Sequence, residues 1–289
     1  MRPVSDVRSF CLRVLDAGGL EAKLAAPVRS DGRPLDDDDP GPRVERARPA
    51  RDPGLEMRGG AEPLPRPGRL GDPEARVECL ARFAHHELMA VELFAWALLR
   101  WPDAPTALRR GLLAALTDEQ RHCRLYLDRL AAHDAAFIGR AHSDYFWLQA
   151  PAMAASPHGL GAFLAAIGLT LEQANLDFTL VYRDGFRQAG DEASALVCQQ
   201  VHDDEIRHVG LAARWLPRLV PELAADPVGL YAQCVPFPLA ANRAKGRRFD
   251  LPSRRRAGLP DALIEHVRQA RSSQQLAGAP TPASDDSTP

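Results

Sequence analysis

The pentapeptide Asp-Glu-x-Arg-His occurs twice in this chain, at residues 118–122 and 204–208. On an α-helix, side chains three positions apart project from the same face, so the Glu and the His of each copy can reach one point. Glu119 and Glu205 are flanked at helical spacing by mostly apolar residues. A carboxylate on such a face must be paired or must coordinate a cation, because burying it alone costs several kcal/mol. The repeat therefore predicts helices that surround a charged centre.

A lone glutamate on an apolar helical stripe precedes each copy. Glu87 lies 32 residues before Glu119. Glu172 lies 33 residues before Glu205. Each half of the chain is therefore expected to form a helical hairpin, with one Glu on its first helix and a Glu-x-x-His on its second. Two such hairpins bring together four carboxylates and two imidazoles, which is the ligand set of a dinuclear metal site.

The predicted metal ligands are Glu87, Glu119, His122, Glu172, Glu205 and His208. Mixed oxygen and nitrogen donors suit iron or manganese better than zinc or magnesium. We expect two iron ions as the cofactor, with manganese or a mixed iron–manganese pair as alternatives. The opposing interpretation is a helical bundle that retains internal ion pairs and binds no metal.

The helical pattern of the central region predicts its architecture. Long helices are expected at about 73–100, 106–133, 159–189 and 191–216. The first and third connections are short, so the helices that they join should be antiparallel. The middle connection, about 134–158, is long enough to cross the whole bundle. We therefore expect an all-α protein whose residues 73–217 form a ferritin-like four-helix bundle, made of two helical hairpins joined by one long crossover.

The regions that flank the bundle differ in composition. Ten of the 25 prolines and seven of the 21 glycines lie between Pro27 and Pro73. Such a stretch is not a packed element, so it is either an extended wrapping arm or partly disordered. The expected divisions outside the bundle are an N-terminal helical segment (1–26, with a helix near 5–17), a Pro/Gly-rich arm or linker (27–72), a C-terminal helical extension (218–271, with turns near 222–235 and 260–271) and a low-complexity, disordered tail (272–289).

Composition limits the classes of partner and location. The formal charge of −2 produces no general attraction to nucleic acid or to an anionic membrane. Charged residues interrupt every apolar run, so neither a membrane span nor a signal peptide is expected. The five cysteines are scattered and form no C-x-x-C. They predict a protein of the reducing cytoplasm, without a disulfide framework or a rubredoxin-type centre.

Several stretches resemble the ferritin-like superfamily of di-iron carboxylate proteins, and more narrowly a bacterial ferritin-like family of unassigned function. The similar stretches include "FAHHELMAVEL", "LTDEQRHCRLYLDRLAAHDAAF" and "DDEIRHVGLAARWL". The resemblance implies metal ligation by the six residues named above. It also implies that Asp118 and Asp204 each hydrogen-bond the ring of a ligand His from the opposite half, which would fix its tautomer. The alternative for these aspartates is a surface pair with Arg121 and Arg207.

Other polar residues near the predicted centre are candidates for further roles. His202, one turn before Glu205, is a candidate extra ligand or proton carrier, and Tyr126 is a candidate redox-active phenol. The simpler interpretations are a hydrogen-bonded core histidine and a core tyrosine. Glu92 and Asp177 each lie five residues after a lone Glu and point away from it, so we expect them to support the ligands or to contact neighbouring helices; metal ligation is the alternative.

A dinuclear iron site of this kind favours an O2-dependent oxidoreductase or hydroxylase, which acts on a small molecule and takes electrons from a donor that these residues do not identify. One alternative is iron handling, as a ferroxidase or storage protein. Another is a non-catalytic metal-binding scaffold. The basic segment 242–258 is a candidate site for an anionic substrate, even a tRNA; the other interpretation is a surface stretch that docks on the acidic arm.

Overall fold

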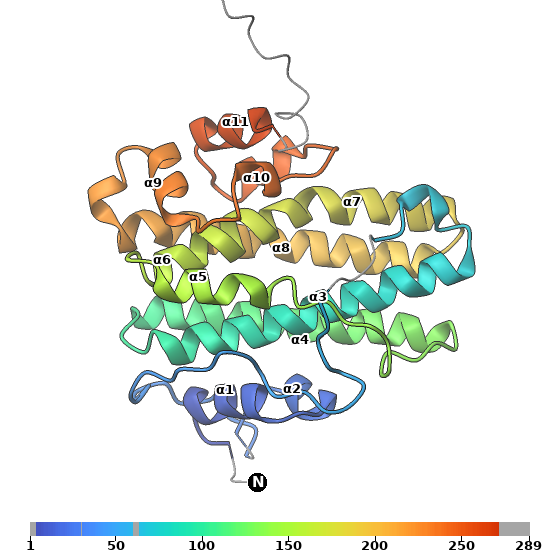
Figure 1. Ribbon diagram of the computed structural model, residues 1–289, viewed down its shortest axis with the longest axis horizontal. Helices are drawn as coiled ribbons and strands as arrows, with labels where there is room; N and C mark the ends of the chain where they lie inside the picture. Colours follow the sequence, from blue (N-terminus) through green and yellow to red (C-terminus); the bar gives the residue numbers. More distant parts are fainter. Residues whose placement is uncertain (1–3, 30, 60–63, 272–289) are drawn as a thin grey trace, which may run out of the picture.

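The computed structural model describes residues 4–29, 31–59 and 64–271, and over these residues the protein is helical without strands. Its main body consists of long helices that run along one axis (Figure 1). These are α3 (Pro73–Arg100), α4 (Thr106–Ala132), α7 (Gln173–Gln188) and α8 (Glu192–Leu219). Helix α3 packs on α4, α7 packs on α8, and α4 packs on α8 across the two pairs. The expected all-α class is confirmed.

The first of these helices begins where the sequence predicts. The Asp72 side chain accepts a hydrogen bond from the backbone N–H of Glu74, and Pro73 occupies the first helical position. Both features favour a helix start, because the cap satisfies a free N–H and proline has none to satisfy. Nineteen of the 28 residues of α3 are buried, including Glu87 and Glu92. This helix therefore runs through the interior of the protein.

The segment that the sequence predicts as one helix over 159–189 is divided. It begins as α6 (Leu160–Phe163), widens into the π-helical segment η3 (Leu164–Glu172) and continues as α7. The Thr170 hydroxyl donates to the carbonyl of Ala165, five residues earlier, at 2.7 Å. A Cβ atom added at Gly168 would lie 2.4 Å from the Cβ of Ala212 on α8, so only glycine allows this close packing. The wider turn ends at Glu172, one of the predicted ligands.

The long crossover between the two helical pairs contains the short elements η2 (Trp147–Gln149) and α5 (Ala150–Ala155). It lies against α3: the ring of His142 stacks on His85, and the ring of Phe146 stacks on His86. The buried Trp147 indole donates to Glu92 at 3.1 Å. The crossover is therefore part of the packed interior as well as a connection.

The N-terminal region covers one side of α3 and α4 (Figure 1). It contains α1 (Val7–Asp16) and α2 (Leu20–Leu24), followed by an arm whose described residues contain one short helical turn, η1 (Pro67–Arg69). The backbone N–H of Val44 donates to the carbonyl of Leu99 on α3 at 3.0 Å, and the side chain of Leu55 is buried. The described part of the arm is thus extended and wrapped around the protein.

The C-terminal region lies over α7 and α8 (Figure 1). Its helices are α9 (Pro227–Cys234), α10 (Leu251–Arg256) and α11 (Asp261–Gln269), with short turns η4 (Pro221–Leu223) and η5 (Ala241–Arg243). Helix α10 was not expected from the sequence. The predicted disordered tail, 272–289, lies outside the described residues.

The basic segment 242–258 docks on α7 and not on the acidic arm, so the docking expectation was wrong. Arg254 pairs with Asp177 on α7, and Arg248 pairs with Asp184. The acidic arm has a different partner, because its Asp37 binds Arg109 on α4. Local charge complementarity alone could not distinguish these pairings.

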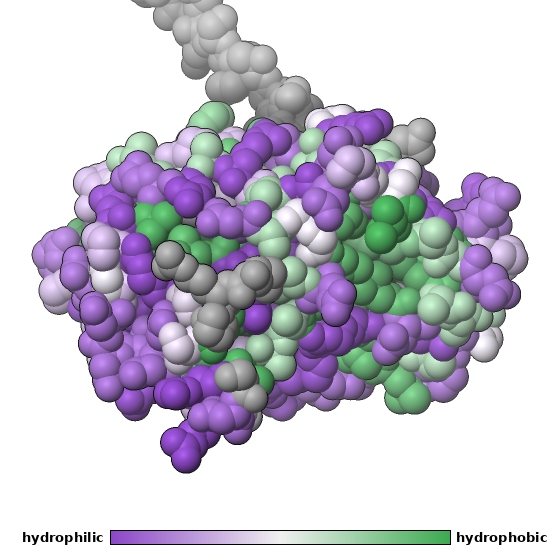
Figure 2. Space-filling model, turned by 90° about the horizontal axis from the view of Figure 1, so that it is seen from below, coloured by the Kyte–Doolittle hydropathy of each residue, from purple (hydrophilic) through white to green (hydrophobic). Residues whose placement is uncertain are grey.

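The surface on the side that carries the N-terminal region is mainly hydrophilic, and hydrophobic patches lie among the hydrophilic residues (Figure 2). None of the described helices combines the length and apolarity that are needed to cross a membrane.

Candidate metal centre

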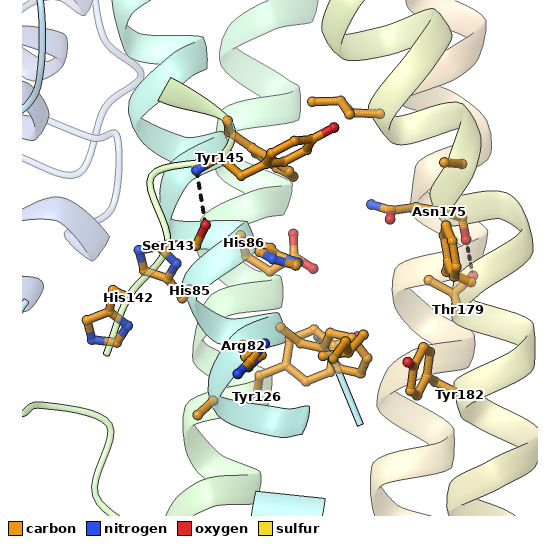
Figure 3. A pocket seen from close by; sticks show the side chains of 18 of the residues that line it. Arg82, His85, His86, Tyr126, His142, Ser143, Tyr145, Asn175, Thr179 and Tyr182 are labelled. Carbon is orange, nitrogen blue, oxygen red and sulfur yellow. Dashed lines mark hydrogen bonds between the residues drawn. The ribbon is translucent and has the colours of Figure 1, made fainter. Parts of the chain in front are cut away.

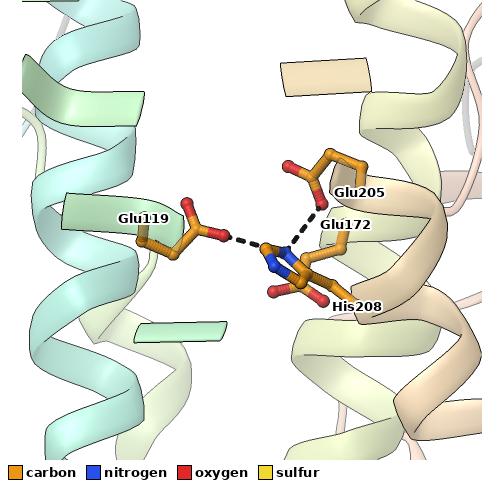
Figure 4. Close-up of side chains that lie close together, drawn as sticks. All are labelled: Glu119, Glu172, Glu205 and His208. Carbon is orange, nitrogen blue, oxygen red and sulfur yellow. Dashed lines mark ion pairs between the residues drawn. The ribbon is translucent and has the colours of Figure 1, made fainter. Parts of the chain in front are cut away.

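The six predicted ligands lie together between the long helices. One group comprises Glu119, Glu172, Glu205 and His208, and an overlapping group comprises Glu87, Glu119 and His122. Within each group, the potential ligand atoms all lie within 4.8 Å of one another, and every one of these residues is buried. Glu119 belongs to both groups. Figure 4 shows the first group, with Glu119 facing His208 across the space between the helical pairs.

Each imidazole is oriented by an aspartate from the opposite half. His122 Nε2 lies 2.9 Å from Asp204 Oδ2, and His208 Nε2 lies 3.2 Å from Asp118 Oδ2. A carboxylate at Nε2 favours the tautomer with its proton there, which leaves the Nδ1 lone pair for a metal. The Nδ1 atom of His208 faces inward and lies 3.0 Å from Glu119 Oε1.

The same two aspartates also bind arginines. Arg121 Nη2 lies 2.7 Å from Asp118 Oδ1 and 2.5 Å from Asp204 Oδ2. Arg207 Nη2 lies 2.6 Å from Asp204 Oδ1 and 3.1 Å from Asp118 Oδ2. The two interpretations of these aspartates therefore coexist: each contacts both arginines on its outer side and an imidazole on its inner side. Burial raises the pKa of Asp118, but His208 and Arg121 lower it more strongly, so the aspartate remains charged.

The electrostatics of the cluster are those of crowded carboxylates. Burial, together with the neighbouring Glu119, raises the pKa of Glu87 well above its usual value. Burial also raises the pKa of Glu172. Burial lowers the pKa of His122, but Glu119 and Asp204 more than offset this and raise it to about 9. Burial raises the pKa of Glu119 too, but His122 and His208 lower it more strongly, to well below its usual value. Glu87 and Glu172 thus bind protons, and the charged Glu119 holds the imidazole protonated, which is the response of a site that attracts positive charge.

The donor atoms at the centre fit a metal because most of them lack hydrogen-bond partners among the described residues. Among the described residues, no hydrogen bond reaches either oxygen of Glu119, Oε1 of Glu172, Oε2 of Glu205 or Nδ1 of either histidine. The inward contacts of Glu119 with His122 and His208, and of Glu205 with His208, are ion pairs without hydrogen-bond geometry. Buried polar atoms are nearly always hydrogen-bonded, so such a concentration of unpartnered oxygen and nitrogen atoms needs a specific cause. Two bound cations would supply it.

Glu205 differs from the other carboxylates. Its Oε1 atom accepts a hydrogen bond from Asn175 Nδ2 at 2.8 Å, while Oε2 has no such partner. Oε1 is thereby held toward α7, and Oε2 remains available to a metal ion. The sequence repeat did not indicate Asn175, because its role depends on how α7 packs against α8.

A cavity of about 520 Å³ reaches this centre. Glu87, Asn175 and Tyr126 are among its lining residues. Figure 3 shows His86 and Tyr145 on one side of the cavity, and Asn175 and Thr179 on the other. The sequence did not predict the cavity, since its walls come from α3, α7, the crossover and the C-terminal region.

A family model described as a protein of unknown function, DUF455, matches residues 20–265. This chain belongs to the DUF455 family. No curated protein and no solved structure matches it significantly. The matched region of this DUF455 protein contains all six ligand candidates, the crossover and most of the C-terminal region.

His202 lies outside both groups of potential ligands. Its Nδ1 atom is 3.1 Å from the Thr179 hydroxyl, and its Nε2 atom is 3.0 Å from the Ser253 hydroxyl. Both ring nitrogens are thus occupied, and the ring connects α7, α8 and α10. The structure does not place it as the extra ligand that the sequence suggested.

Tyr126 lies in the core and on the wall of the cavity. Its ring centroid lies 5.3 Å from that of Phe83, and its hydroxyl lies 3.9 Å from Cys198 Sγ. Burial raises the pKa of Tyr126 well above its usual value, so the phenol is neutral. Its contacts are those of a core tyrosine whose ring borders the cavity.

Glu92 is fully buried and anchors the N-terminal region of this DUF455 protein. Arg51 donates to both of its oxygens at 2.8 Å, and Lys23 Nζ lies 3.0 Å away. The Trp147 indole supplies a further donor. The sequence indicated an inter-helix partner for Glu92, but its partners come from α2, the arm and the crossover.

Asp177 has the equivalent role for the C-terminal region. Arg254 donates to both of its oxygens, at 2.7 and 2.9 Å. The backbone N–H groups of Gly246 and Asp250 donate at 2.8 and 2.7 Å. The matching acids of the two halves therefore hold the two flanking regions in place.

Proposed function

We propose that this protein is a ferritin-like four-helix bundle that holds two iron ions and acts as an O2-dependent oxidoreductase or hydroxylase on a small molecule. The observation that supports this most strongly is the set of buried, unpartnered carboxylate and imidazole atoms that face one another at the centre. Buried acids in a core are normally hydrogen-bonded, so the convergence of carboxylate oxygens that lack such bonds favours metal ligation over structural ion pairing.

The proposed ligation follows the two groups of donor atoms. Glu119 belongs to both groups and would therefore help to hold both ions. Glu87 and His122 complete one side; Glu172, Glu205 and His208 complete the other. The carboxylates supply negative charge, and Asp118 and Asp204 hold the imidazoles with Nδ1 inward.

Iron ions bound there would supply the binding of dioxygen and the oxidation of a nearby substrate. All six ligand candidates are buried, which limits their contact with bulk water. The cavity brings a substrate to within contact of Glu87, and its volume of about 520 Å³ suits a small molecule. A storage protein needs no such cavity beside its metals, so the cavity favours substrate oxidation over iron storage. The five buried free cysteines are compatible with a reducing cytoplasm.

Anaerobic reconstitution with Fe(II) tests the proposal. We expect about two irons per chain, and an absorbance and Mössbauer change when oxygen is admitted. Mn(II) loading is the matched control, since it tests the site without the same oxygen reactivity. Continued uptake of many irons per chain would support storage instead. Failure to bind either metal would reject the metal centre and leave a helical scaffold.

A further inference from the structure

The cavity beside the metal centre has an apolar inner part. The ring of Phe83 packs 5.3 Å from Tyr126 and 5.0 Å from Tyr182, measured between ring centroids. Leu171 and Phe178 also line the cavity from the opposite helical segment. In Figure 3, Tyr126 and Tyr182 lie at the same end of the cavity. These side chains present aromatic and apolar surface next to Glu87.

The outer part of the cavity is basic. Its lining includes Arg82, Arg140, Arg243 and Lys245. Glu78 is shared by the first two: Arg82 Nε lies 2.6 Å from one oxygen, and Arg140 lies 3.2 Å from the other. Their charges are thus partly neutralised at the rim.

The other two cations of the rim form no ion pair with any carboxylate that the structure describes. Arg243 donates to the Tyr145 hydroxyl at 2.7 Å and lies over its ring. Lys245 donates to the backbone carbonyl of Arg268. Both partners are neutral, so each cation keeps a full positive charge to offer to a ligand at the mouth.

We propose that this cavity binds a small molecule with an apolar, ring-sized body and one anionic group. The body lies against Phe83, Tyr126 and Tyr182, and the anion lies at Arg243 and Lys245. Arginine forms short, charge-assisted hydrogen bonds to carboxylates and phosphates, which orient such a ligand. The role of this molecule as the oxidised substrate rests on the proposed di-iron function; its binding does not.

The basic segment itself favours a small anion over a nucleic acid. Three of its other arginines are engaged within the fold: Arg254 is buried against Asp177, Arg248 binds Asp184, and Arg255 binds Asp261. Arg247 and Arg256 are exposed and do not line the cavity. A nucleic acid would need a stripe of cations for successive phosphates. Here Arg243 and Lys245, which have no carboxylate partner among the described residues, both line one cavity.

Calorimetric titration of the full-length, Fe(II)-loaded protein under anaerobic conditions tests the assignment. The probes are 1-naphthaleneacetate, 1-naphthyl phosphate and the neutral 1-naphthaleneacetamide. We expect at least one of the two anions to bind about tenfold more tightly than the amide, as charge-assisted hydrogen bonds are stronger than neutral ones. The tighter of the two anions identifies the natural head group. Equal affinity for all three probes would overturn the proposal.

Variants locate the anion site. The double substitution Arg243→Gln, Lys245→Gln should remove most of the preference for the anion and leave amide binding unchanged. Arg247→Gln is the matched control, because this exposed arginine of the same segment is not part of the cavity lining. An unchanged preference in the double variant would reject the site. Tighter binding of unfractionated tRNA than of either acid, lost on the double substitution, would also reject it in favour of a nucleic acid.

Iron content measured on the same samples separates the two proposals. If the protein binds two irons but shows no preference for the anionic probes, the proposed substrate class is rejected and the di-iron proposal is retained. An anion preference without iron binding would reject the di-iron function and retain the anion-binding cavity. Circular dichroism of the double variant verifies that it is folded.

Discussion

Glu119 and Glu92 are both buried acids, yet their surroundings are opposite. Glu92 is 0% exposed and receives donors from Arg51, Lys23 and Trp147. Glu119 is 1% exposed, and neither of its oxygens has a hydrogen-bond partner in the part of the chain that the structure describes. Asp177 resembles Glu92, with Arg254 as its partner.

The comparison teaches that burial alone does not identify a metal ligand. A buried acid that meets a cation with good geometry is part of the structure, since the pair offsets its own desolvation. A group of buried acids whose oxygens lack hydrogen-bond partners costs stability and therefore needs a specific cause, such as metal binding. The following experiments test this distinction, beginning with the largest expected effect.

Removal of the shared ligand should have the largest effect. Glu119→Ala is expected to lower the iron content from about two per chain to less than one, because this residue belongs to both groups of donor atoms. Metal analysis after anaerobic loading measures the change. Glu74→Ala, an exposed acid on α3, is the control and should retain full iron content. Full iron content in Glu119→Ala would contradict the ligand assignment.

Removal of an anchor should affect stability instead. Glu92→Ala leaves the Lys23 and Arg51 charges buried without their partner. We expect a loss of about 3–5 kcal/mol in the free energy of unfolding, measured by urea denaturation. Asp177→Ala should behave similarly at the other end. The folded fraction of either variant should still bind about two irons. Loss of metal without loss of stability would contradict the assignment of Glu92 and Asp177 as structural residues.

The orienting aspartates lie between these extremes. Asp204→Asn removes the carboxylate that fixes the His122 ring, and we expect iron to bind about 10–100-fold more weakly. A competition titration with a chelator measures this affinity. The neighbouring Asp203→Asn is the control, because its side chain is exposed. An unchanged affinity would show that Asp204 serves only its arginine pairs.

The smallest expected effect concerns a buried base. Burial, and after it the positive charge of Arg51, lowers the pKa of His142 to about 4. The unfolded chain therefore binds a proton more readily than the folded protein between about pH 6.5 and 4, so stability should fall as the pH falls through this window. After allowance for solvent screening, we expect His142→Gln to remove about 1 kcal/mol of the stability difference between pH 7 and pH 5.

Denaturation curves at both pH values measure this effect. His158→Gln, at a partly exposed position, is the control. An identical pH dependence of the wild-type protein and His142→Gln would show that His142 is protonated without cost.

Helix positions were predictable where the signals are local. The cap at Asp72 and the apolar stripe of α3 set its limits, and 73–100 agrees with the structure. The division of 159–189 was not predictable, because η3 depends on contacts with distant residues. Thr170 bonds to the Tyr231 hydroxyl at 2.8 Å, and Gly168 packs on Ala212.

The candidate site also has a part that local sequence signals predicted and a part that they did not. The spacing of three residues predicted that Glu119 and His122 share a face, and the structure brings them together with the other four residues. Asn175 and the cavity walls had no sequence signal. They depend on which surface of α7 faces α8 and on where the crossover and C-terminal region lie.

The sequence by itself determined the all-α class and the residues that can supply metal ligands, because helical periodicity and donor chemistry are properties of short segments. Only the tertiary structure decided which buried acids have partners. The cations that neutralise Glu92 and Asp177 come from segments far along the chain, whose positions depend on packing of the whole fold. That difference in partners is what separates the anchors from the proposed ligands.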